Sequence, residues 1–115
     1  MQTSIKAIIS FLIASFIGAL GQYLYKTGAE SAKGGLISYI TNPRLLLGVV
    51  SYILVMVLFV VAFKFGGALT VLYPVYATTF IWGTIIGALF LGEAISIVKV
   101  LGIALIIFGV YLIAR

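Results

Sequence analysis

The stretch RLLLGVVSYILVMVLFVVAFK, residues 44–64, decides the fold class of this chain. The residues between Arg44 and Lys64 carry no charge, and a helix of about 20 mostly apolar residues is what crosses the hydrocarbon of a bilayer. A basic residue at each end is typical of membrane-interface anchors, whose aliphatic stems lie in apolar surroundings while their charges reach water. We therefore expect a transmembrane helix over residues 45–63.

The composition of the whole chain agrees with a membrane protein. Of 115 residues, 64% are hydrophobic and 8% are charged, whereas about 25% of the residues of a soluble domain are charged. This is too little charge to cover a globule of this size, so a water-soluble monomer is excluded. The net charge of +5 is spread over single basic residues near the ends of apolar runs. We attribute it to the membrane interface and predict no nucleic-acid partner.

Three further apolar runs flank the central one and complete a set of four. Lipid leaves no backbone group unpaired, so all four runs are predicted to be helices. The fold class is therefore an all-α membrane protein with a single four-helix transmembrane domain over residues 1–115. The predicted helices are about 7–25, 45–63, 68–91 and 95–114. The first run, with Lys6 before it and small residues near its end, also allows a secretory signal, but it continues to Tyr25 and is long enough to span.

The connections fit this arrangement. Residues 27–44 form the only long loop, and its apolar patch 36–40 is predicted to lie along the membrane interface. Asn42 and Pro43 are a helix-start signal, with the asparagine as cap and the proline in the first turn. Residues 64–67 and 92–94 are predicted to be tight turns.

The basic residues give little information on orientation. Four spans place both ends of the chain on one side, with Lys6, Lys64 and Arg115, and leave Lys26, Lys33, Arg44 and Lys99 on the other. Three charges against four leave the positive-inside rule almost nothing to act on. Either a weak bias still selects one orientation, or the chain inserts both ways and two copies pair as an antiparallel dimer. We favour the second alternative, because four helices alone hardly enclose a pathway.

Several kinds of chemistry are excluded by composition. The chain has no Cys and no His, and its only acids are Glu30 and Glu93. We therefore predict no metal site, no cofactor and no enzyme activity. Neither acid lies within a predicted span, so a titratable group for proton coupling is missing as well.

The first helix carries a stripe of small and polar residues. Ser15, Gly18, Gln22 and Lys26 lie three or four residues apart, and hence on one helix face. Such a stripe serves either close helix packing or binding. Lys26 is then either an interface anchor or a cation at the mouth of a cavity, suited to a phosphate or another anion.

The third helix holds the other candidate binding residues. Pro74 cannot donate to the carbonyl of Thr70, so a kink is expected there. The polar and aromatic side chains around it are Tyr73, Tyr76, Thr79 and Trp82. Because Trp82 lies near the middle of its run and not at an interface belt, it is either a packing residue or a cavity wall.

Four glycines indicate close contacts between helices. Gly83 and Gly87 follow Thr79 at four-residue spacing, and Gly102 and Gly109 are seven residues apart on the last helix. Glu93, at the water boundary after the third helix, is expected to cap or charge the start of the fourth.

These features together resemble a known family. Four short spans and the segment from Gly102 to Gly109 resemble the small multidrug resistance proteins of the drug/metabolite transporter superfamily. Residues 90–93 (Phe-Leu-Gly-Glu) are similar to the signature before the last helix of the EamA-type transporters. The end of the first helix, residues 21–26, and the pattern from Tyr73 to Trp82 resemble the undecaprenyl-phosphate-aminoarabinose flippase subunits.

The resemblance implies a flippase in the inner or plasma membrane of the cell. It would act as a dimer, with homodimer and heterodimer both open, and would move a polyprenyl-phosphate-linked sugar or related anionic solute by alternating access. The membrane lipid and this substrate are the implied partners. The implied binding residues are Gln22, Lys26, Tyr73, Tyr76, Thr79 and Trp82.

One departure from the drug-exporting members is specific. Gly18 stands where their essential first-helix glutamate is expected. Proton-coupled drug export is therefore the weaker alternative. A further alternative is a non-transporting subunit of a heteromeric membrane complex.

Overall fold

The computed structural model describes residues 4–114, which form six helices and no strand. The helices are α1 (Ile5–Ser31), α2 (Leu36–Ile40), α3 (Pro43–Lys64), α4 (Leu69–Tyr76), α5 (Thr79–Phe90) and α6 (Ile97–Ala114). By length and composition, α1, α3 and the α4–α5 pair can each cross a membrane, and α6 is a shorter apolar helix. The prediction of an all-α, multi-pass membrane protein is confirmed. Arg115, predicted as an interface anchor, lies outside the described residues.

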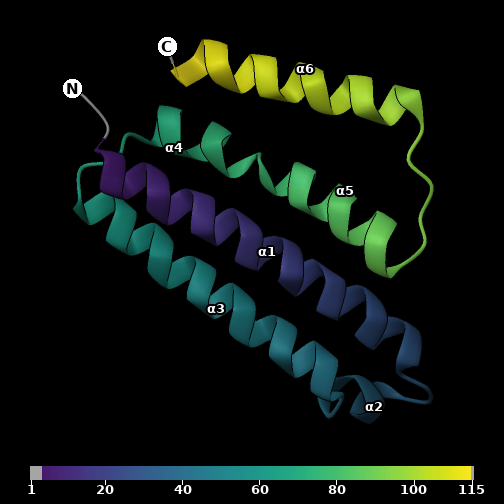
Figure 1. The fold of residues 1–115 in the computed structure, drawn as a ribbon. Coiled ribbons are helices and arrows are strands. Elements are labelled where there is room, and N and C mark those ends of the chain that lie inside the picture. Colours follow the sequence, from purple (N-terminus) through teal and green to yellow (C-terminus); the bar gives the residue numbers. More distant parts are fainter. Residues whose placement is uncertain (1–3, 115) are drawn as a thin grey trace.

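The long helices lie side by side in one layer (Figure 1). α1 runs between α3 on one side and the α4–α5 pair on the other, and α6 lies beyond that pair. The extents of 51 × 37 × 18 Å confirm that the molecule is a flat slab. Successive long segments reverse direction, so both ends of the chain lie at the same edge, as four crossings require.

α1 is longer than the predicted span of residues 7–25. The side chain of Ser4 caps its start by accepting from the backbone N–H of Ala7 at 3.1 Å. At the other end, Thr27 donates to the carbonyl of Tyr23 at 2.9 Å and Ser31 donates to that of Gly28 at 3.0 Å. Hydropathy marks where a helix meets hydrocarbon, whereas the helix itself continues with polar residues until its backbone bonds end. The predicted loop 27–44 is accordingly helical over much of its length.

The start of α3 is as predicted. The side-chain oxygen of Asn42 accepts from the backbone N–H groups of Arg44 at 3.0 Å and Leu45 at 3.3 Å, and Pro43 lies in the first turn. The amide nitrogen of Asn42 also donates to the carbonyl of Gly28 at 3.1 Å. The cap of α3 therefore also binds this helix to the end of α1.

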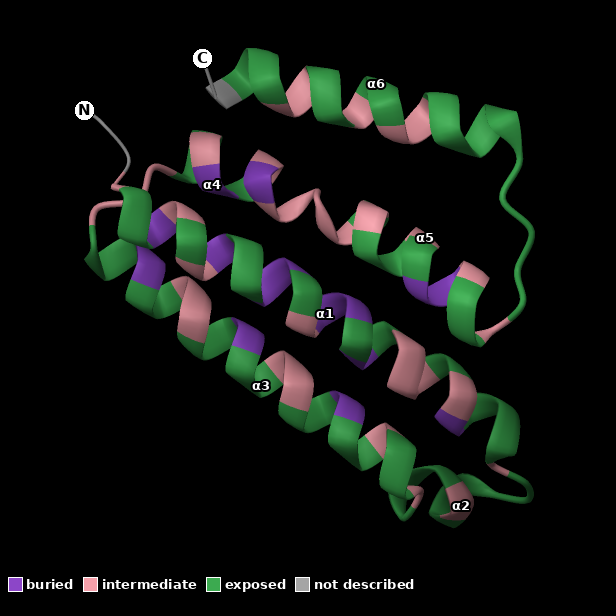
Figure 2. Cartoon of the chain, in the orientation of Figure 1, coloured by how far each residue is buried: buried purple, intermediate pink, exposed green. Residues whose placement is uncertain are grey.

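α1 and α3 pack through small residues spaced seven apart. On α1 these are the buried Ala7, Ala14, Gly21 and Gly28, and on α3 they are the buried Gly48, Val55 and Ala62. A seven-residue spacing keeps one face of a helix toward its neighbour, and Figure 2 shows the buried residues of α1 along its length. The repeat is visible in the sequence, but none of its residues is among the packing residues predicted above.

The third apolar run was predicted to form one helix over residues 68–91, but it forms two, α4 and α5. Between α4 and α5, the N–H of Ala77 donates to the carbonyl of Pro74 at 2.9 Å and that of Thr78 donates to Val75 at 3.1 Å. These are the tight bonds of a 3₁₀ turn. The irregularity expected at Pro74 therefore appears three residues later. The hydroxyl of Thr78 donates to that of the buried Ser15 at 2.9 Å, which packs the break against α1.

The last helix is attached loosely. The tight turn predicted at residues 92–94 is instead an irregular connection that lasts until α6 begins at Ile97, and not at 95 as predicted. α5 ends at Phe90, and Gly92, two residues further on, has a φ of +67°, which suits a residue without a Cβ atom. None of residues 97–113 is buried, and α6 packs mainly against α4 (Figure 2).

We expect Gly21→Ala to lower the free energy of unfolding by about 1–3 kcal/mol, the usual cost of overfilling a packed contact. A Cβ atom at Gly21 would lie 2.8 Å from the ring of Tyr52 and 3.2 Å from Cβ of Ser51. The ring cannot yield freely, because it stacks on Tyr25 with centroids 5.4 Å apart. Titration with dodecyl sulfate, followed by circular dichroism, measures the change.

Gly83→Ala is the matched control, since a Cβ atom there meets no atom within 4 Å. Because alanine is the better helix former, this variant should be as stable as the unmodified chain or more stable. Equal destabilisation by both variants would contradict the packing of α1 on α3.

Candidate functional site

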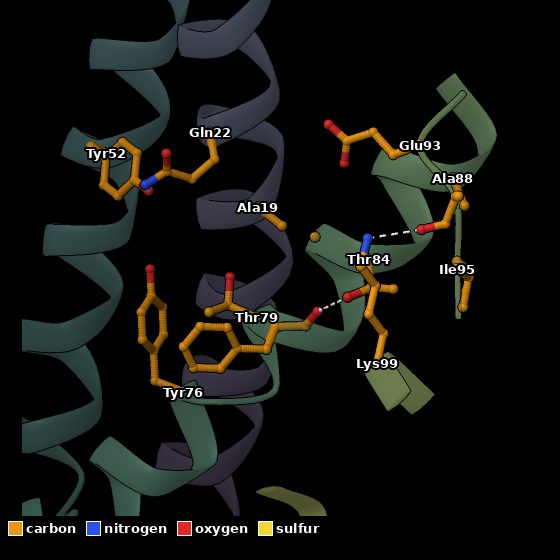
Figure 3. Close-up of a pocket in the computed structure, with 13 residues that line it drawn as sticks. Ala19, Gln22, Tyr52, Tyr76, Thr79, Thr84, Ala88, Glu93, Ile95 and Lys99 are labelled. Carbon is orange, nitrogen blue, oxygen red and sulfur yellow. Dashed lines mark hydrogen bonds between the residues drawn. The ribbon is translucent and has the colours of Figure 1, made fainter. Parts of the chain in front are cut away.

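A cavity of about 540 Å³ lies beside α1, between α3, α4, α5 and the connection to α6. Its lining is mixed, with apolar residues and a set of polar side chains contributed by several helices (Figure 3). The polar side chains are those of Gln22, Tyr52, Tyr76, Thr79, Thr84, Glu93 and Lys99. An uncharged amide, four hydroxyl groups and one charge of each sign thus meet within a chain of apolar helices.

Three of the predicted binding residues lie on this cavity. Gln22 comes from α1, Tyr76 from the end of α4 and Thr79 from the start of α5. Thr79 also donates to the carbonyl of Ser15 at 3.0 Å, which fixes its side chain against α1. Gly83, predicted as a packing residue, borders the same cavity, and a Cβ atom there would meet nothing within 4 Å.

Gln22 is oriented by a residue that sequence reasoning missed. Its amide nitrogen donates to the hydroxyl of Tyr52 at 2.6 Å, and that hydroxyl donates to the carbonyl of Gly18 at 3.2 Å. In Figure 3, Gln22 points from α1 toward Tyr52 on α3. A tyrosine in the middle of an otherwise apolar span was the available signal, because a hydroxyl group within hydrocarbon needs a partner.

Lys26 lies at the end of this site and is paired. It borders a smaller cavity of about 130 Å³, which shares Gln22, Gly83 and Glu93 with the large one. The ammonium nitrogen of Lys26 lies 3.5 Å from a carboxylate oxygen of Glu93 and 3.7 Å from one of Glu30. Both acids of the chain therefore pair with one lysine. Its side chain is 48% exposed and that of Glu93 is 49% exposed, so water and solutes reach the pair.

Glu93 reaches Lys26 across a glycine. A Cβ atom at Gly87 would lie 2.5 Å from a carboxylate oxygen of Glu93, so a larger residue there would displace this flexible side chain from its position. The backbone N–H of Glu93 also donates to the carbonyl of Gly87 at 3.0 Å. Glu93 was predicted to cap or charge the start of the last helix, whereas its side chain points back toward Lys26 on α1. Gly87, predicted to pack against a helix, borders this carboxylate.

The site contains a second cation, Lys99, whose sequence position predicts an interface anchor. Lys99 lines the large cavity, and its ammonium group donates to the carbonyl of Ala94 at 2.8 Å. The signal was its position about one turn inside an apolar run. Sequence alone could not show that α6 would place this residue on the same cavity as Glu93.

Tyr73 and Trp82 lie away from the large cavity. Tyr73 is exposed and, with Pro74 and Gly109, borders a separate apolar cavity of about 460 Å³ between α4 and α6. Trp82 packs edge-on against Phe16 of α1 with ring centroids 5.0 Å apart. The structure thus brings neither residue together with Gln22. A Cβ atom at Gly102 or Gly109 would meet no atom of the described chain within 4 Å.

The comparisons with known proteins assign no family. No protein-family model, curated protein or solved structure matches this chain. Among the described residues, no group of three or more metal-ligating side chains is present. The observations that bear on function are therefore the three cavities and the charges at their edge.

A double-mutant cycle tests the bond that orients Gln22. We expect Tyr52→Phe and Gln22→Leu each to destabilise the fold, and the pair to show a coupling energy of about 0.5–1.5 kcal/mol. Unfolding in dodecyl sulfate of the unmodified chain, both single variants and the double variant gives this energy. Strictly additive effects would mean that the 2.6 Å bond does not form in solution.

Proposed function

We propose that this protein moves an amphipathic, anionic solute across a cell membrane, and that its cargo is a polyprenyl-phosphate-linked sugar or a related lipid. The observation that carries the proposal is the polar cavity in a chain whose helices otherwise present apolar side chains to lipid. A sugar phosphate that crosses hydrocarbon unaided loses its hydrogen bonds to water, at a cost of several kcal/mol for each polar group. A cavity lined by amide, hydroxyl and ammonium groups replaces part of that water.

The dimensions and chemistry of the site support such a cargo. A volume of about 540 Å³ falls within the range of about 300–1,000 Å³ typical of small-molecule sites. Gln22, Tyr76 and Thr79 offer hydrogen bonds to sugar hydroxyls, while Lys26 and Lys99 offer charge to a phosphate. The apolar cavity between α4 and α6 shares Tyr76, Thr79 and Phe80 with the polar one, so a hydrocarbon tail can follow the head group.

The working unit that we propose is an antiparallel dimer in the inner or plasma membrane. One copy is a single layer of helices, and its cavity is open on one side. Gly102 and Gly109 on α6 have space beside them for a second copy. Alternating access then follows from the rocking of one copy against the other, as in transporters built from inverted repeats.

Two alternatives each have one observation in their favour. Glu93 is the one carboxylate on the large cavity, and it would suit a cationic drug or metabolite. The exposed apolar surface of α6 would suit a different small membrane protein, with this chain as a subunit. An imposed pH gradient that drives transport would favour the first alternative. A partner that co-purifies at fixed stoichiometry would favour the second.

Transport can be measured in liposomes with a fluorescently labelled polyprenyl-phosphate sugar, whose exposure is read by dithionite quenching. We expect protein-dependent flipping, and we expect Lys99→Gln to lower its initial rate about tenfold, because hydrogen bonds to charged groups are worth about 1.5–3 kcal/mol. The same substitution at Lys64 is the matched control, since that lysine lies at the other end of the molecule and lines neither cavity. No flipping above protein-free liposomes, or equal losses for the two variants, would contradict the proposal.

Dual insertion can be measured by cysteine labelling, because the chain has no native cysteine. Gly35 is exposed, has open space around it and lies in the connection before α2. In intact inverted vesicles, an impermeant maleimide should label about half of Gly35→Cys molecules, because the basic residues hardly bias insertion. Labelling close to none or close to all would show a single orientation and exclude the antiparallel dimer.

A further inference from the structure

We propose that Glu93 is an internal competitor for the anion site: its carboxylate occupies Lys26 in the empty protein, and the phosphate of the cargo displaces it. This inference rests on the proposed function and adds a role for a residue that lines the large cavity but is not among the proposed sugar-binding residues. Both acids of the chain form an ion pair with Lys26, but they lie on different kinds of backbone segment.

The two carboxylates differ in how they are carried. Glu30 lies one turn beyond Lys26 on α1, so it moves with the lysine. Glu93 lies in the irregular connection between α5 and α6. An ion pair between half-exposed side chains is worth about 0–1 kcal/mol. Glu93 is therefore the partner that can leave, at a small cost.

The charges at the mouth of the site require Glu93 to leave Lys26 when a phosphate binds. Lys26 and Lys99 supply two positive charges, and Glu30 and Glu93 supply two negative ones. A phosphate that entered without any rearrangement would meet a neutral site with two carboxylates close by. When Glu93 moves away, the phosphate takes its place at 3.5 Å from Lys26 and the local charge becomes favourable.

The packing of Gly87 supports a specific resting place for Glu93. One carboxylate oxygen lies 3.5 Å from the ammonium nitrogen of Lys26, while the other lies 2.5 Å from the position that a Cβ atom of residue 87 would take. This gives a way to move the carboxylate without removing its charge. Gly87→Ala should push it from its position, because the far end of a flexible side chain yields more easily than a helix backbone.

An internal competitor also suits a carrier. Cargo that bound Lys26 without competition would be held tightly on both sides of the membrane, and release would limit turnover. Return of Glu93 to Lys26 as the phosphate leaves replaces one ion pair by another. Lys26 therefore keeps an anionic partner besides Glu30 throughout the cycle.

The test is the binding of octyl phosphate, used as a single-chain anionic probe, to the full chain in phosphatidylcholine nanodiscs at fixed salt. Isothermal titration gives the Kd, and protein-free nanodiscs correct for partition into lipid. We expect Lys26→Gln to weaken binding about tenfold, as the loss of a charge-assisted contact predicts. We expect Glu93→Gln to strengthen it about fivefold.

Glu30→Gln is the matched control for charge. It removes the same negative charge from the same lysine, but from the residue that lies on α1 itself. We expect less than a twofold change. Gly87→Ala should strengthen binding by an intermediate factor, while Gly35→Ala, where a Cβ atom has open space and which lines neither cavity at Lys26 and Glu93, should not change it. Helix content by circular dichroism confirms that each variant is folded.

The outcomes separate this inference from the proposed function. If Lys26→Gln weakens binding but Glu93→Gln leaves it equal or weaker, the competitor is disproved and the anion site stands. If Glu30→Gln strengthens binding as much as Glu93→Gln, net charge is the cause and the competitor is likewise disproved. If the unmodified chain binds octyl phosphate but Lys26→Gln binds it equally, Lys26 is not the anion site and the competitor is disproved. If the unmodified chain does not bind octyl phosphate above protein-free nanodiscs, the anionic cargo itself is disproved.

Discussion

The packing of α1 against α3 through small side chains is the contact on which the rest of the structure depends. In a bilayer the hydrophobic effect does not drive helices together, so they associate through close packing and hydrogen bonds. Glycine and alanine at seven-residue spacing let the two backbones approach along most of α1. The same helix then presents Ser15 and Gln22 to the α4–α5 pair and the cavity.

The break between α4 and α5 is the second requirement of the site. Its tight turn is bound to α1 through the hydroxyls of Thr78 and Thr79, which meet the hydroxyl and carbonyl of Ser15. Tyr76, just before the break, is close to Gly18, and no larger residue would fit there. The space that a side chain at position 18 would need is thus filled by a tyrosine from another helix.

The sequence predicts the spans, the cap at Asn42 and three residues of the cavity, because hydropathy, capping and helix periodicity are local properties. It does not predict Tyr52, the site role of Lys99 or the pairing of Glu93 with Lys26, because each depends on which helices become neighbours. The position of Trp82 also follows from the break, since a tight turn changes the phase of α5 relative to α4. Periodicity over an unbroken helix cannot anticipate that rotation. The dimer, the cargo and the membrane of residence stay predictions.

The single layer of helices has a consequence for the surroundings of the protein. Only nine apolar residues of the described chain are buried, so the broad faces of the slab are left for acyl chains wherever a second copy does not cover them. The annular lipid then takes the place of the second layer that a soluble domain builds from its own side chains. Lipid chain length and unsaturation therefore become determinants of how closely α6 approaches α4. For this molecule the tertiary packing of the last helix therefore depends on the surrounding lipid.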